Sequence, residues 1–238
     1  MSKLKNNDDN LKKFKTLKKE KNESIGDYAV RVIEYNIINM FLPPGIFISE
    51  KIISDMLDIS RTPVREAFSI MEKLNFIEIY PQKASRVSLI DIDIIDETSF
   101  MRRTLEKEII KIVCDKCSNQ ELKLLSDNVY QYRKNMKNDD LYKLLNIDNN
   151  FHEILFSIAN KNLTYSIVKD SIKHFNRARI FNIMEMDRSR ILKEHQDIFQ
   201  AIKEKNSKKA VSLIETHLTH VTEDLKFLKN KFPDYFKD

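Results

Sequence analysis

The sequence predicts a mainly α-helical protein in two parts, in which a small helical unit ending in a β-hairpin precedes a larger, all-helical bundle. Apolar residues recur at helical spacing along most of the 238 residues. Only two glycines and five prolines are available for the turns that a β protein would need. Short β-rich runs replace the helical period over residues 76–90. Hydrophobic residues make up 42% of the chain, which is enough for the core of one large or two modest domains.

The chain opens with residues 1–23, a lysine- and asparagine-rich stretch without an apolar segment for export. We expect a disordered basic tail, which either adds non-specific attraction to phosphates or only keeps the chain soluble. No apolar run approaches the roughly 18 residues of a membrane span, so a cytoplasmic protein without a membrane partner is expected. Cys114 and Cys117 form a single Cys-x-x-Cys pair, for which reduced, partly buried thiols are expected and a redox role is the alternative.

Three helices are predicted next, within residues 24–90. The first covers about 24–41, where Ala29, Val32, Ile33, Ile37 and Met40 share one face, and the Pro-Pro-Gly run ending at Gly45 stops it. Ser49 is expected to cap the second helix, and Ser60 to cap a third that has Pro63 in its first turn. Two short helices joined by a tight turn predict a helix-turn-helix.

Basic side chains cluster in this unit. Arg61 and Arg65 lie off the apolar face of the third helix, four residues apart, where like charges repel one another. This spacing therefore does not stabilise the helix, but it suits the binding of a polyanion. The alternative is an ordinary solvated helix face. The hairpin over 76–90 carries Lys83 at its tip and Arg86 just after it. A basic helix start and a basic hairpin in one small unit predict DNA binding, although a net charge of +5 alone would not.

The stretch PPGIFISEKIISDMLDISRTPVREAFSIMEKLNFIEIYPQKASRV resembles the winged helix-turn-helix of GntR-family transcription regulators. The family pattern stands here as Pro44-Gly45 and as Ser60 to Ala67, within a match that covers about residues 24–90. This resemblance implies a set of DNA-facing residues on the second and third helices, namely Lys51, Ser60, Arg61, Thr62 and Arg65.

Residues 91–238 return to the helical period and predict the bundle. Asp91 and Asp93 are candidate caps for a first helix that runs to about Lys116. Further helices are expected at about 119–137, 139–159, 163–184, 188–205 and 207–230.

All five histidines lie in this second part. His152, His195 and His217 each adjoin the apolar face of a different helix, and Asp148 lies one turn before His152. A buried polar group without a partner costs a few kcal/mol, so several of them favour a shared partner. A divalent metal fits this role: zinc first, with nickel, manganese and iron left open. Histidines scattered over the surface are the alternative.

The bundle resembles the FCD domain of the FadR-like GntR subfamily, through Asp148-x3-His152, Glu194-His195 and His217-Leu218. The resemblance implies that Asp148, His152, His195 and His217 are the metal ligands. It also implies that Arg102, within an Arg-x3-Glu element, receives the carboxylate of a small effector by a bidentate bond. His174 and His220 stand outside this set.

Together these features predict a DNA-binding transcriptional regulator and not an enzyme. By resemblance it is expected to be a homodimeric repressor that binds a palindromic operator, and a small organic acid at the metal would modulate that binding. Three alternatives remain open: a metal-dependent, hydrolase-like enzyme, a regulator that senses the metal alone, and a purely structural metal.

Overall fold

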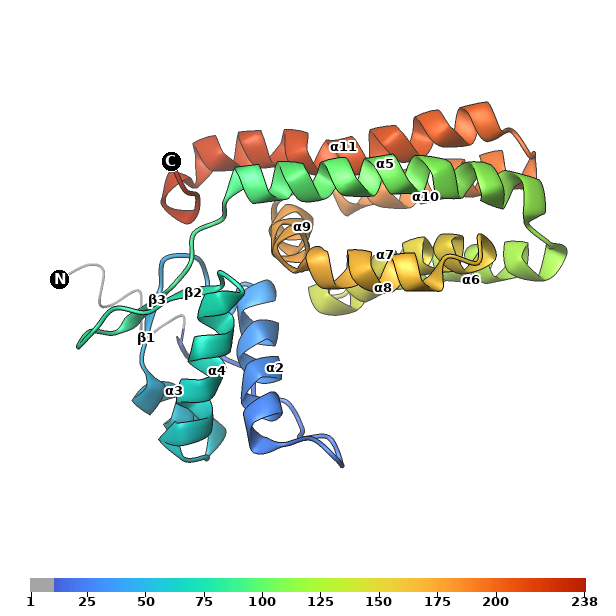
Figure 1. Ribbon diagram of the computed structural model, residues 1–238. Coiled ribbons are helices and arrows are strands. Elements are labelled where there is room, and N and C mark those ends of the chain that lie inside the picture. Colours follow the sequence, from blue (N-terminus) through green and yellow to red (C-terminus); the bar gives the residue numbers. More distant parts are fainter. Residues whose placement is uncertain (1–10) are drawn as a thin grey trace. The chain divides into compact units, whose positions relative to one another are not determined.

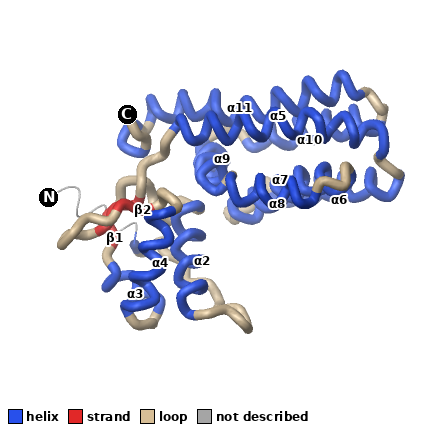
Figure 2. The backbone as a smooth tube through the Cα atoms, in the orientation of Figure 1, coloured by secondary structure: helices blue, strands red, loops and turns tan. Residues whose placement is uncertain are grey.

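The structure, a computed structural model, describes residues 11–238 and divides into two compact units (Figure 1). Of the described residues, the first contains 11–91 together with Lys229–Asp238, and the second contains Ile92–Leu228. Helices dominate both units, and within the described range the strands belong to the first (Figure 2). The predicted mainly helical fold is confirmed. Among residues 11–238, none of the helices combines the length and apolar character needed to cross a membrane.

Three helices form the body of the first unit: α2 (Ile25–Ile38), α3 (Glu50–Leu57) and α4 (Arg61–Lys73). Ser49 caps α3 as predicted, since its hydroxyl accepts a hydrogen bond from the backbone N–H of Ile52 at 3.2 Å. Ser60 occupies the N-cap position of α4, but its hydroxyl makes no capping hydrogen bond, so that part of the prediction is wrong. Pro63 lies in the first turn of α4, where its missing N–H costs nothing.

A small antiparallel sheet completes the helix-turn-helix, in the strand order β1-β3-β2. The hairpin strands are β2 (Ile77–Glu78) and β3 (Ser85–Val87), which are shorter than the sequence predicts. Strand β1 (Phe47–Ile48) was not predicted, and it pairs with β3. Gly45 enables this, because its φ of 80° turns the chain and its N–H donates to the carbonyl of Val87 at 2.8 Å.

The described part of the predicted tail, residues 11–23, departs from the disorder that we expected. Leu11 is buried in the core of the first unit, and Phe14 and Leu17 pack against that core. The side-chain amide of Asn36 pairs with the backbone of Lys15, with hydrogen bonds of 2.8 and 2.9 Å. The rest of the predicted tail, residues 1–10, lies outside the described residues.

The end of the chain belongs to the first unit rather than to the bundle in which we expected it. Beyond the short 3₁₀ helix η1 (Pro233–Tyr235), Phe236 is buried and forms a parallel bridge with Ile90. The N–H of Ile90 donates to the carbonyl of Tyr235, and the N–H of Lys237 donates to the carbonyl of Ile90. These contacts hold the two ends of the unit's chain together.

The second unit is a helical bundle. Its helices are α5 (Ile92–Lys116), α6 (Asn119–Asn135), α7 (Leu141–Ile158), α8 (Asn162–Ser171), α9 (Lys173–Glu185), α10 (Arg188–Lys203) and α11 (Ser207–Lys231), of which the last three residues belong to the first unit. One predicted helix, 163–184, is in fact two, α8 and α9, which are separated at the buried Ile172. This break lets α8 pack on α7 while α9 turns into the interior, where it is buried on nearly all sides.

Helix α7 is central to the bundle, because it packs against α5, α6, α8 and α9. Its buried face carries Asp148 and His152 among leucines and phenylalanines. Cys114 is buried and Cys117 is half-buried, both as free thiols. Burial raises the pKa of both thiols, that of Cys117 to about 11, which keeps them protonated and unreactive at neutral pH.

Candidate nucleic-acid interface and metal centre

The start of α4 presents basic and hydroxyl side chains to solvent. Arg65 Nε lies 3.3 Å from Glu50 Oε2, which brings the first turns of α3 and α4 next to each other. This ion pair is exposed and contributes little to stability, so Arg65 can exchange Glu50 for another anion at low cost. The exposed side chains of this face are Lys51, Ser60, Arg61, Thr62 and Arg65.

The hairpin carries the other two predicted DNA-facing residues in different surroundings. Lys83 is exposed in the turn between β2 and β3. Arg86 is half-buried in the central strand, where its guanidinium forms an ion pair with Glu78 at 2.7 Å. Lys83 is therefore free to meet a phosphate, whereas Arg86 is already engaged within the sheet.

In the second unit, three imidazoles and a carboxylate converge between α7, α10 and α11. His217 Nε2 lies 3.3 Å from His152 Nε2 and 3.4 Å from His195 Nε2. Asp148 Oδ1 lies 3.4 Å from His195 Nε2, and Asp148 Oδ2 lies 3.7 Å from His152 Nε2. One ligand atom from each residue falls within 4.8 Å of all the others, and all four residues are buried. The structure thus brings together all four residues that the sequence predicts as metal ligands.

Two carboxylates outside the cluster determine which imidazole nitrogens of His152 and His217 face the other candidate ligands. His152 Nδ1 is 2.5 Å from Glu106 Oε2, and His217 Nδ1 is 2.7 Å from Glu194 Oε2. A neutral imidazole that donates from Nδ1 carries a lone pair, not a proton, on Nε2. Two lone pairs therefore face each other across 3.3 Å, an arrangement that a cation between them would stabilise.

The spacing also fits a metal. Four ligand atoms at about 2.1 Å from a tetrahedral zinc ion lie about 3.4 Å apart. Three of the distances measured between Asp148, His152, His195 and His217 are 3.3 or 3.4 Å. Neutral imidazoles with one carboxylate also suit nickel, manganese or iron, so the cluster could hold a divalent cation whose identity the geometry leaves open.

Burial keeps these imidazoles neutral. It lowers the pKa of His152 and, more strongly, that of His195, which also stacks on the ring of Phe151 at 4.1 Å. Burial lowers the pKa of His217 to about 4, against the opposing effect of Glu194. Because a metal binds the neutral ring, these histidines need not lose protons at neutral pH before they bind one.

Two buried arginines adjoin the cluster. Arg179, on α9, forms an ion pair with Asp148, and it also donates to Asn176 and Asn149. Arg102 Nε, on α5, donates to Glu106 Oε1 at 2.8 Å. Burial alone would raise the pKa of Glu106, but Arg102 and His152 lower it to about 2. Glu106 therefore connects an arginine directly to a candidate metal ligand.

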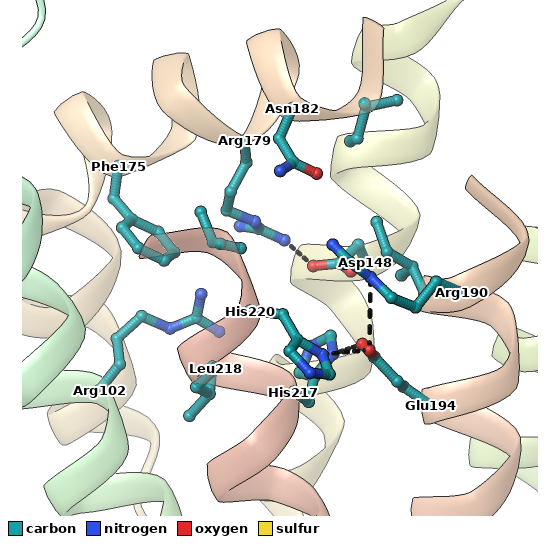
Figure 3. Close-up of a pocket in the computed structure, with 13 residues that line it drawn as sticks. Arg102, Asp148, Phe175, Arg179, Asn182, Arg190, Glu194, His217, Leu218 and His220 are labelled. Carbon is teal, nitrogen blue, oxygen red and sulfur yellow. Dashed lines mark hydrogen bonds and ion pairs between the residues drawn. The ribbon is translucent and has the colours of Figure 1, made fainter. Parts of the chain in front are cut away.

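A cavity lies beside the cluster, lined by Arg102, Asp148, Arg179 and His217 among others (Figure 3). Its volume is about 20 Å³, which is roughly the space of one water molecule. Arg102 is 2% exposed, and its hydrogen bond to Glu106 uses Nε and leaves the terminal Nη atoms available within residues 11–238. Its guanidinium points toward the interior of the site, as expected for a residue that would bind an anion there.

A polar network forms the opposite wall. Glu194 joins His217 to His220, whose Nδ1 lies 2.6 Å from Glu194 Oε1. Arg190 lies 3.7 Å from the same carboxylate and forms an ion pair with Asp224. The predicted position of His220 outside the ligand set is consistent with this role as a partner of Glu194.

Sequence reasoning missed several of these residues. Glu106 was noted only as part of a motif, and its contact with His152 joins residues 46 positions apart. Arg179 was not considered at all, although an arginine within the apolar run of α9 is a signal of a buried ion pair. Asp224 and Arg190 gave no signal, because charged residues spaced along a helix usually lie on its solvated face.

Comparison with known proteins supports this organisation. The family model of the FCD domain matches residues 97–220. The chain is 24% identical over 217 residues to the HTH-type transcriptional repressor RspR of Escherichia coli K12, covering 91% of this chain and 95% of that protein. It is 28% identical over 196 residues to the uncharacterized HTH-type transcriptional regulator YdhC of Bacillus subtilis, covering 80% of this chain and 86% of that protein.

Solved structures have the same fold. E. coli McbR/YncC superposes with a TM-score of 0.68 at 15% identity, covering 88% of this chain and 99% of that one. A GntR regulator from Rhodococcus sp. RHA1, described as a transcriptional regulator from structural genomics, gives a TM-score of 0.66 at 22% identity, covering 85% and 97%. At these identities the likeness concerns the fold alone.

Proposed function

We propose a ligand-controlled repressor, from the premise that this chain belongs to the GntR-family transcriptional regulators that have an FCD domain. The chain is therefore a DNA-binding transcriptional regulator and not an enzyme, because the relatives that it matches along most of their length are named regulators. This excludes the hydrolase-like alternative. Repression, the metal, the acid effector and the dimer are the parts that we propose.

The proposed DNA contact is made by the start of α4 and by the hairpin. Arg61 and Arg65 would reach base edges in the major groove, where an arginine can bind guanine by two hydrogen bonds. The remaining exposed residues of this face, Lys51, Ser60 and Thr62, would contact phosphates and fix the register, and so would Lys83. Arg86 would act by holding the hairpin through Glu78.

In the second unit, we propose that a divalent cation binds to Asp148, His152, His195 and His217. It would supply a positive charge, and it could receive an acid only if it took five or six ligands instead of the four of a tetrahedral site. A small organic acid would bind there through its carboxylate, which Arg102 would also receive. The acid can change DNA affinity only by binding one arrangement of the regulator more tightly than another.

One observation carries this proposal: the converging Nε2 lone pairs of His152 and His217 lie beside a cavity into which the buried Arg102 faces. Among the described residues, the anionic partner of Arg102 is Glu106, which His152 shares. An anion at the cavity would therefore act on the metal and on one of its ligands at the same time.

The test combines metal analysis with thermal unfolding against a panel of small carboxylic acids. Wild-type protein should retain about one divalent ion per chain and should melt at a higher temperature with the correct acid. Arg102→Ala should keep the ion and lose the acid's effect, and His152→Ala should lose both. Arg103→Ala is the matched control, because its side chain reaches Thr219 instead of the cavity, so it should behave as wild type. Protein without a bound ion would contradict the proposal.

A second function, sensing of the metal alone, is favoured by the size of the cavity. At about 20 Å³ it has no room for an acid unless the site opens. If metal alone changes operator affinity and no acid in the panel changes it further, the metal is the signal. The operator for this comparison can be selected from random duplexes.

We also propose that the regulator is a homodimer. Two-fold symmetric dimers match palindromic operators, whose half-sites are separated by about one helical turn. Light scattering should give twice the mass of the chain, and a single half-site should bind much more weakly than the palindrome.

A further inference from the structure

Residues 11–23 form an ordered strap along α2. Their apolar side chains pack on the core of the first unit, and their backbone is held by α2. Asn36 is fully buried and pairs with the Lys15 backbone, and the Tyr28 hydroxyl donates to the carbonyl of Leu17 at 3.0 Å. Arg31 donates to the carbonyl of Lys18 at 3.1 Å. The strap is therefore fixed as far as the turn that follows it.

In this turn, residues 18–23, the acidic side chains and the lysines have different surroundings. Glu23 accepts two hydrogen bonds from Arg31, at 2.6 and 2.7 Å, and Arg31 lowers the pKa of Glu23 to about 2. Glu20 lies 3.9 Å from the same guanidinium. Both acids of the turn thus face Arg31. The turn also contains three lysines, Lys18, Lys19 and Lys21. Their side chains are exposed and make no ion pair within residues 11–238.

The turn lies at the end of the first unit where α4 begins. It leads through the cap residue Ser24 directly into the first turn of α2. There Gly26 faces α4, since a Cβ on Gly26 would lie 3.7 Å from Glu66 Oε2. Figure 1 shows α2 and α4 beginning at the same end of this unit. The lysines therefore flank the end from which Arg61 and Arg65 project.

We propose that the turn Lys18–Glu23 is a second DNA-contacting element, which binds the phosphate backbone beside the half-site that α4 reads. A duplex that meets the start of α4 continues past it on both sides, and the hairpin with Lys83 can cover only part of that length. Three ammonium groups on a fixed turn lose less conformational freedom on binding than the same lysines on a disordered tail would. This inference rests on the proposed mode of DNA binding by α4.

The test compares wild type with the variant Lys18→Ala/Lys19→Ala/Lys21→Ala, in the full-length protein. Binding to the selected operator is measured by fluorescence anisotropy from about 50 to 200 mM salt. Each lost phosphate contact reduces the salt slope by about 0.9, so the loss of three contacts per protomer should lower the slope by about 3 per half-site and by about 5 for a dimer on the palindromic operator. Hydroxyl-radical footprints should lose protected sugars outside the half-site, while those over the half-site remain.

The matched control is Lys123→Ala/Lys134→Ala/Lys137→Ala, which removes the same charge from exposed positions of the second unit. It should keep the wild-type slope and footprint. A Lys18/Lys19/Lys21 variant that also keeps them would overturn the inference, and the strap would then serve stability alone. The outcome is separate from the proposed function: loss of operator binding in Arg61→Ala supports the role of α4 whichever way the strap variant behaves.

Discussion

The arginines of α4 that we propose to contact DNA lie on the surface, whereas the arginines beside the candidate metal cluster are buried with partners. Arg61 is exposed on α4, and Arg65 makes only an exposed ion pair. Arg102 and Arg179 are 2% and 5% exposed, and each pairs with a buried carboxylate. A surface charge can be removed with little effect on folding, but removal of one member of a buried pair leaves the other uncompensated. With the proposed roles, DNA contact by α4 and folding depend on different residues, whereas ligand binding and folding of the second unit depend on the same contacts.

The largest expected effect tests the buried half of this comparison. Glu106→Gln removes the charge that holds both Arg102 and His152, and it should destabilise the second unit by about 3–5 kcal/mol. Glu108→Gln, two residues away, breaks only an exposed pair with Lys111 and should cost at most about 1 kcal/mol. Amide hydrogen exchange of the second unit measures both. Equal small losses would mean that the buried pair is unimportant.

The pH dependence of stability should differ between the units. His217 has a pKa of about 4 when folded and about 6.5 when unfolded, so below pH 6.5 the unfolded chain binds a proton that the folded one does not. Stability of the metal-free second unit is therefore full above about pH 6.5 and should decline as the pH falls toward about 4. The first unit contains no histidine and should show no such loss in hydrogen exchange over this window. A parallel loss in both units would show that the histidines are not its cause.

A smaller effect is expected from substitution of an exposed arginine at the start of α4. Arg61→Ala should weaken operator binding by about 1–3 kcal/mol, or roughly 5- to 150-fold, and relax base preference at one position. The melting temperature should remain that of wild type, because the side chain is exposed. Arg133→Ala, on α6, is the control for a general loss of charge. A large stability change in Arg61→Ala would break the separation of function from folding.

The smallest effect concerns two serines that occupy the same kind of position. Ser49→Ala removes a capping hydrogen bond and should cost about 1 kcal/mol of stability in the first unit. Ser60→Ala removes none, so it should leave stability unchanged and reduce only DNA affinity. Thermal unfolding and operator titration of the two variants separate these outcomes. Equal destabilisation would mean that Ser60 caps α4 in solution.

Local sequence patterns were enough to predict most of the helices and to suggest that three histidines lie together, whereas the full candidate ligand set came from the family resemblance. Helix starts depend on a cap and an apolar period, both of which are local, as at Ser49. His152, His195 and His217 could be grouped because each lies on the apolar face of its own helix. Because the buried faces of neighbouring helices meet in the core, polar residues on those faces can lie close together.

Contacts between distant segments could not be predicted in this way. Strand β1 is two residues long and exists only because β3 lies beside it. The break between α8 and α9 follows from packing, because no proline or glycine marks Ile172. The strap was read as a disordered tail because its lysines outnumber its apolar residues, yet Leu11, Phe14 and Leu17 suffice to anchor it.

The bridge between Ile90 and Phe236 affects how the protein is made. Most of the DNA-binding unit precedes the bundle in the sequence, yet one of its buried side chains, Phe236, follows the bundle. On the ribosome this unit must wait for the whole bundle to be translated before its final contact can form. A nascent regulator would thus complete its DNA-binding unit only after its FCD domain has been translated.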